Sequence, residues 1–114
     1  MYVISQIMTQ IKNSNLKTIT ISGHHLKMDE WAIIDEFEIL YHWQNDLGLE
    51  VFFNVKYDYD WDLYDWHVLL VNQDNILIDL EYVGMYCDQF SDMPEFINHE
   101  LKQQSQKPKK DRIG

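Results

Sequence analysis

The sequence predicts an α+β fold in which helices pack on one face of an antiparallel meander of three to four strands. Three observations lead to this prediction. Apolar residues recur at helical spacing near both ends of the chain and once between them, residues 51–83 alternate with a period of two, and short polar segments divide that stretch. Such short connections join antiparallel strands, and amphipathic helices bury their apolar sides against the sheet. The expected order of elements is α-β-α-β-β-β-α.

Length and composition indicate a single domain. The chain has 114 residues, of which 46% are hydrophobic, and this is enough for one conventional core. We expect the domain to span residues 1–102, and residues 103–114 to form a polar, weakly basic tail. The single cysteine, Cys87, excludes an internal disulfide framework. No basic segment of a signal peptide and no apolar run of about 18 residues occurs, so we expect a cytoplasmic protein.

The first two elements follow from local spacing. Ile4, Ile7 and Ile11 predict a short amphipathic helix over residues 2–12. Residues 17–22 are rich in β-branched side chains with a period of two, which predicts a strand. A turn follows it at residues 22–25.

Residues 29–46 carry the clearest helical spacing. Asp29 suits the start of a helix because its carboxylate accepts hydrogen bonds from free backbone amides, and Gly48 suits its end. The expected buried stripe consists of Ile33, Ile34, Phe37, Leu40 and Tyr41, and the expected acidic outer side consists of Asp35, Glu38, His42 and Asp46.

The second half of the chain changes to strand periodicity. Alternation over residues 51–62 predicts one long strand. A turn is expected at 63–65, and the alternative is a turn that begins nearer Asp58. Strands are expected at 66–71 and 76–83, with a hairpin turn at 72–75 between them. Asp92, followed by Pro94, predicts the start of a last helix.

Charge is distributed very unevenly. The chain has 19 acidic and 9 basic residues, a net charge of -10, yet between Met28 and Leu101 there are 18 acidic residues and one basic residue, Lys56. Soluble surfaces ordinarily mix both signs. This imbalance disfavours nucleic acids and membranes as direct ligands and favours a cationic partner. The alternative is an acidic surface that serves only solubility.

The segment from residue 57 to residue 66 is the most unusual in the chain. In an extended strand, Asp58, Asp60 and Asp62 would project from one face about 6.6 Å apart, like the charges of a polyanion. The neighbouring aromatic rings would supply rigid apolar anchors of the kind common in protein interfaces. The alternative is a hairpin end whose carboxylates remain hydrated while its rings pack on the sheet.

Other chemistry has weaker support. An EF-hand loop counted from Asp58 would need Gly at Leu63 and Glu at Leu69, so that calcium motif fails. The adjacent His24 and His25 point apart in regular structure, and no partner ligand stands at a metal-binding spacing from them. His67 beside a carboxylate would suit a general base. We expect no catalytic residues, no cofactor and no metal.

The sequence therefore predicts an acidic protein-binding inhibitor rather than an enzyme. It would neutralise a basic, nucleic-acid-acting partner by occluding its active or nucleic-acid-binding site, as an immunity protein, an antitoxin against a nuclease toxin or a phage anti-defence inhibitor does. A small metal- or His-dependent enzyme and an adaptor subunit are the alternatives. The expected contact residues are Asp58, Tyr59, Asp60, Trp61, Asp62, Tyr64 and Asp65, extended by Asp35 and Glu38.

Overall fold

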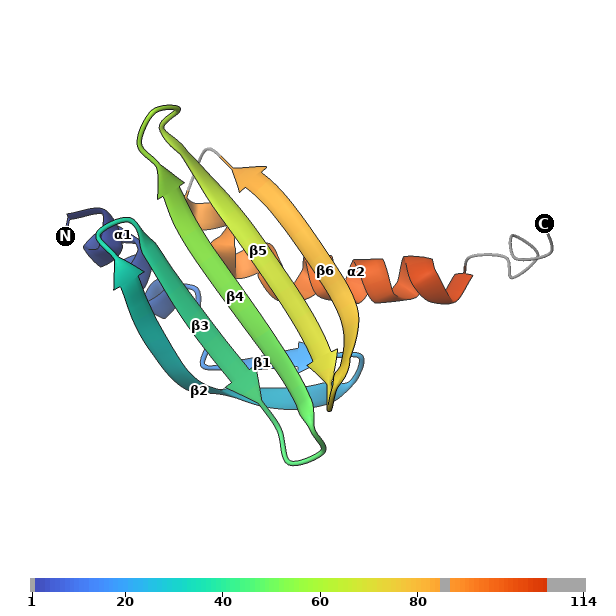
Figure 1. Ribbon diagram of the computed structural model, residues 1–114. Helices are drawn as coiled ribbons and strands as arrows, with labels where there is room; N and C mark the ends of the chain where they lie inside the picture. The colour runs from blue at the N-terminus through green and yellow to red at the C-terminus, as the bar shows by residue number, and fades with distance from the viewer. Residues whose placement is uncertain (1, 85–86, 107–114) are drawn as a thin grey trace.

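Six strands form one antiparallel sheet in which each strand pairs with its neighbours in the sequence (Figure 1). The computed structural model describes residues 2–84 and 87–106. Its elements are α1 (Tyr2–Asn13), β1 (Thr18–Ile21), β2 (His24–Asp35), β3 (Glu38–Gln44), β4 (Leu49–Asp58), β5 (Leu63–Asn72), β6 (Asn75–Gly84), the 3₁₀ helix η1 (Cys87–Asp92) and α2 (Met93–Gln106).

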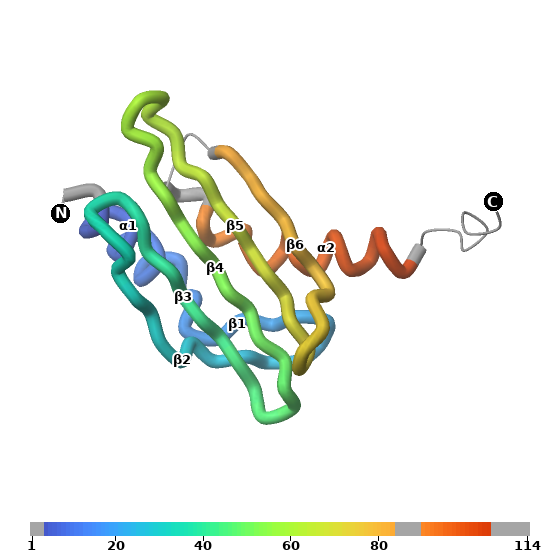
Figure 2. Tube along the Cα trace, viewed as in Figure 1, coloured from blue at the N-terminus to red at the C-terminus, as the bar shows by residue number. Residues whose placement is uncertain are grey.

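The predicted class is confirmed at the coarse level, since the fold is α+β with an antiparallel meander. The sheet has six strands rather than three to four, and it curls. Helix α2 contacts the last two strands, β5 and β6, and also β1 at the opposite edge of the sheet (Figure 2). Helix α1 contacts η1. Packing of the helices on one face is not clearly borne out, because the sheet curls and α2 contacts strands near both of its edges.

The prediction of a helix over residues 29–46 is wrong, because this stretch forms the β2–β3 hairpin. Ile39, Tyr41 and Trp43 alternate with outward residues, and β3 pairs with β2 on one side and β4 on the other. Sheet pairing on both sides overrides the local helical spacing. The Asp35 carboxylate accepts a hydrogen bond from the Phe37 backbone N–H at 2.8 Å, which closes the turn.

The predictions for the two ends of the chain are largely confirmed. Helix α1, strand β1, the two last strands and the start of α2 lie where the sequence places them. The predicted turn at 22–25 is confined to Ser22 and Gly23, both with positive φ. Helix α2 continues to Gln106, past the expected domain end at residue 102, and residues 107–114 of the expected tail lie outside the described residues.

The core fills the hollow of the sheet with aromatic and branched side chains. Phe90 of η1 packs edge-on against Phe53 and Trp66, with ring centroids 5.9 Å and 5.2 Å away, respectively. The Trp43 indole N–H donates to the backbone carbonyl of Leu16 at 2.6 Å, which ties the α1–β1 connection to the sheet. Both helices contribute apolar residues to this core, including Ile4, Ile7, Ile11, Met93 and Ile97.

The open edge of β1 is capped by one side chain of α2. The Asn98 amide N–H donates to the Thr20 carbonyl at 2.9 Å, and its carbonyl oxygen accepts from the Ser22 backbone N–H at 2.7 Å. This pair of bonds has the donor–acceptor pattern that a neighbouring strand would offer. Unpaired sheet edges invite pairing with other chains, so Asn98 protects this edge.

We predict that Asn98→Ala lowers the free energy of unfolding by about 1–2 kcal/mol, because both hydrogen bonds are lost. Asn98→Asp keeps an acceptor for Ser22 but places a carboxylate against the Thr20 carbonyl, so it should restore little of the loss. Urea unfolding of both variants measures the effect, with the exposed neighbour His99→Ala as control. Equal stability of Asn98→Ala and His99→Ala would contradict the capping role.

Candidate functional site: an acidic sheet face and two hairpin tips

The outer, convex face of strands β3 to β6 is the most strongly charged surface that the register defines. Inward positions of these strands hold the apolar core, so their acidic residues all fall at outward positions. These strands carry one lysine, Lys56, and no arginine. The outward carboxylates are Glu38, Glu50, Asp58, Asp65, Asp79 and Glu81.

Little of this negative charge is balanced by a permanently cationic side chain, since Lys56 is the one lysine on these strands. Across residues 2–84 and 87–106, each ion pair within 4.0 Å involves a histidine. His67 Nε2 lies 2.6 Å from Asp79 Oδ1, and His42 Nε2 lies 3.0 Å from Glu50 Oε1. Like charges on one face add to a local negative potential, which attracts cationic groups of a partner.

The Asp-rich segment forms a hairpin tip. The strand predicted over residues 51–62 is confirmed up to Asp58, where β4 ends. The turn lies at residues 59–62, so the predicted turn at 63–65 is wrong, because these residues pair with β4 as the start of β5. Strand β4 ends at Asp58, whose carboxylate accepts hydrogen bonds from the backbone N–H of Asp60 at 3.0 Å and Trp61 at 3.3 Å. Asp62 has a φ of 54°, which reverses the chain. Asp58, Asp60 and Asp62 therefore do not form a straight row, because an aspartate at the start of a turn bonds the turn's own amides.

The two exposed rings at this tip are Tyr59 and Trp61, each 74% exposed. Tyr64, also predicted as a contact residue, lies in the core at 7% exposure and contacts the ring of Phe90 at 5.8 Å. Tyr57 donates a hydrogen bond from its phenol to Asp62, and this bond raises the pKa of the Tyr57 phenol. Hydrogen bonds therefore hold the hairpin turn together, while the rings of Tyr59 and Trp61 face the solvent.

The β2–β3 hairpin tip lies beside the β4–β5 tip. The Phe37 ring is 6.2 Å from Tyr57 and 6.0 Å from Tyr59, and the Tyr57 backbone N–H donates to the Phe37 carbonyl at 2.8 Å. Figure 1 shows both turns at the same end of the sheet. Asp35 and Glu38 are therefore brought to the same end as the Asp-rich segment, on a hairpin instead of the predicted helix.

Sequence reasoning missed the position of Glu50, the role of His42 and the joining of separate acids into one face. The period of two over residues 76–83 already separated Asp79 and Glu81 from the apolar positions. The same period over residues 38–44 would have placed His42 with them. Their juxtaposition depends on strand register, which local spacing does not reveal.

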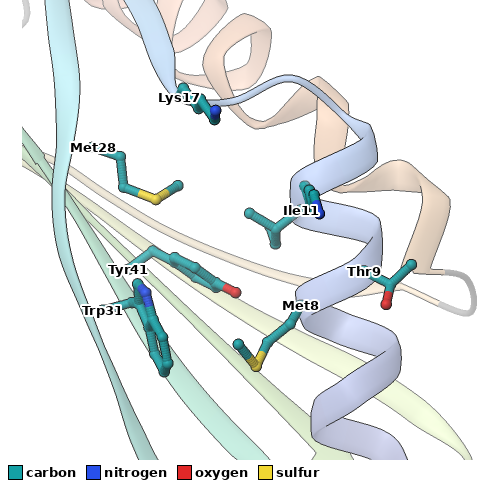
Figure 3. A pocket seen from close by; sticks show the side chains of 8 residues that line it. Met8, Thr9, Ile11, Lys17, Met28, Trp31 and Tyr41 are labelled. Carbon is teal, nitrogen blue, oxygen red and sulfur yellow. The ribbon is translucent and has the colours of Figure 1, made fainter.

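A pocket lies between α1 and β2, apart from the acidic face (Figure 3). Its volume is about 300 Å³, and Figure 3 shows Met8, Ile11, Met28, Trp31 and Tyr41 around it. The titratable groups in its lining are two lysines and the Tyr41 phenol, with no carboxylate or histidine. The rest of the lining is mostly apolar.

No protein-family model matches the chain, and no curated protein or solved structure is significantly similar to it. Among the described residues, neither helix is long and apolar enough to cross a membrane.

Tyr41 makes stability depend on alkaline pH. Burial raises the pKa of Tyr41 from 10.0 to about 12, so the folded protein holds this proton more tightly than the unfolded chain. The stability linked to this phenol is complete below its unfolded pKa and is lost as pH rises through the folded pKa. We predict that the wild type loses about 1.4 kcal/mol more than Tyr41→Phe between about pH 8 and about pH 11. Urea unfolding at both pH values measures this difference, and parallel losses would contradict it.

Proposed function

We propose that this protein binds a basic, nucleic-acid-acting protein and neutralises it by occluding its active or nucleic-acid-binding site. An immunity protein or antitoxin against a nuclease toxin has this role, and so does a phage anti-defence inhibitor. The observation that carries the proposal is the outer face of β3 to β6, where six carboxylates stand with a single lysine. A site built to hold phosphates presents the complementary positive charge.

The mechanism follows from two kinds of contact. The acidic face attracts the basic partner at long range and orients it, which raises the association rate. The exposed rings of Tyr59 and Trp61 then lose water against the partner, and such buried aromatic anchors slow dissociation. Inhibition needs no chemical step, because the bound protein excludes nucleic acid from the site.

Several of the acidic residues already have a structural role within the chain, which supports testing the others. Asp58 and Asp62 accept hydrogen bonds inside the hairpin tip, and Glu38 accepts one from the Asn54 side chain at 2.9 Å. Among residues 2–84 and 87–106, no hydrogen bond reaches the carboxylate of Asp60 or Asp65. Asp65 stands opposite Lys56 on β4 and Val83 on β6, within the acidic face.

We predict that the triple variant Asp60→Asn, Asp65→Asn, Glu81→Gln slows association with the partner about tenfold or more at low salt, because these groups supply the attractive field. The wild type serves as bait in the lysate of the source organism, and the captured protein is purified and tested for nucleic-acid cleavage with and without the bait. The control variant Asp74→Asn, Glu95→Gln, Glu100→Gln removes the same charge from the β5–β6 turn and α2.

Loss of inhibition in the first variant and retention in the control would support the acidic face as the binding site. Equal loss in both would show that only net charge matters. A neutral partner held equally at low and high salt would contradict the proposal and favour an adaptor that binds through apolar residues.

We also predict that Tyr59→Ala with Trp61→Ala increases the dissociation rate of that complex while the free energy of unfolding stays within about 0.5 kcal/mol of wild type, because both rings are exposed. Tyr64→Ala is the contrasting variant and should cost about 3–5 kcal/mol, because that ring is buried. Surface plasmon resonance and urea unfolding measure the two quantities. An unchanged dissociation rate would remove the rings from the interface.

A further inference from the structure

Two adjacent carboxylates face one histidine because β2 contains a β-bulge. Met28 pairs with Trp43 and Glu30 pairs with His42, so Asp29 is an additional residue in the ladder. Successive residues of a regular strand point to opposite faces, but a bulge re-aims the extra residue. One oxygen each of Asp29 and Glu30 and one nitrogen of His42 lie within 4.8 Å of one another.

His42 is held in place from two sides. It is 8% exposed, and its ring stacks on Phe52 with centroids 4.6 Å apart. Its Nε2 atom lies 3.0 Å from Glu50 Oε1. Because a carboxylate only accepts hydrogen bonds, Nε2 carries the proton in this pair. A carboxylate behind the far ring nitrogen is the arrangement that orients many metal-binding histidines.

The other ring nitrogen has no hydrogen-bond partner among the described residues. This buried Nδ1 atom lies 3.5 Å from Asp29 Oδ2 and 3.8 Å from Glu30 Oε1. In the neutral ring with its proton on Nε2, the Nδ1 lone pair faces two anionic groups. A cation between the three atoms would turn this repulsion into attraction.

We propose that Asp29, Glu30 and His42 bind a divalent transition-metal ion of the zinc class, with Glu50 as the positioning residue of His42. Ligand atoms on a tetrahedral zinc ion with bonds of about 2.0–2.1 Å stand about 3.4 Å apart, close to the two nitrogen–oxygen distances here. The imidazole nitrogen favours zinc, cobalt or nickel over magnesium and calcium, which prefer oxygen-only sites.

The site opens to solvent on the side of the carboxylates. The Asp29 and Glu30 side chains are 43% and 74% exposed, whereas that of His42 is 10% exposed. Three protein ligands and an accessible fourth position are the composition of a zinc site that keeps a water molecule or accepts a further ligand. The sequence alone predicts no metal site. It also predicts a helix over residues 29–46, and on such a helix Asp29 and Glu30 would not face His42.

The proposal is tested by calorimetric titration of the full chain, without a histidine tag, with zinc chloride and with cobalt chloride. We expect one equivalent of each metal to bind, tetrahedral-type visible absorption from cobalt, and no comparable binding of magnesium or calcium. Asp29→Asn with Glu30→Gln should weaken zinc binding by roughly 100-fold or more, and Glu50→Gln by roughly 10–100-fold. The two substituted side chains are exposed in the wild type, so the double variant should fold.

The matched control is His67→Ala. His67 also contacts one carboxylate, Asp79, through Nε2, but the described residues bring no pair of carboxylates to its other nitrogen. This variant should bind zinc as the wild type does. The proposal is overturned if the wild type does not bind zinc, or if the double variant binds zinc as tightly as the wild type. Nitrogen-15 spectra that show both His42 ring nitrogens protonated, with no change on zinc addition, would assign the site to a proton instead and overturn it as well.

Discussion

Burial of the inward side chains of β3, β4 and β5 is the constraint on which the rest of the structure depends. Once Trp43, Phe53 and Trp66 point into the hollow, every second residue of these strands must point out. Apolar residues of both helices join this core, and Phe90 completes its aromatic contacts. A carboxylate at an inward position would be buried without a partner, which is costly. The acidic residues of these strands therefore stand on the outer face.

The fold was predictable where one periodicity dominated. Helix α1, strand β6 and the start of α2 each have a clear local pattern that the structure retains. Residues 29–46 carried two patterns at once: Ile33, Ile34 and Phe37 suggested a helix, while Ile39, Tyr41 and Trp43 alternated. Pairing with β4 decided between them, and this partner lies later in the chain. The register shifts near Asp29 and Ile34 further obscured the period of two.

The candidate surfaces were predictable in composition but not in arrangement. Sequence alone indicated an acidic body with Asp58 to Asp65 as its densest part, and the tip does expose Tyr59 and Trp61. The meeting of His42 with Asp29, Glu30 and Glu50 requires one bulge and two strand registers to be known together. Non-local register of this kind is set by the packed sheet, which no single segment encodes.

The amide of Asn98 also imposes an order on biosynthesis. It bonds to Thr20, 78 positions earlier in the chain, so the first strand is made long before the residue that seals its outer edge. At roughly 5–20 residues added per second, the interval is about 4–16 s on the ribosome. Over that time β1 exists without the side chain that caps its edge, so its backbone is open to a chaperone that recognises unpaired strands. The edge closes once α2 has been made and Asn98 reaches β1.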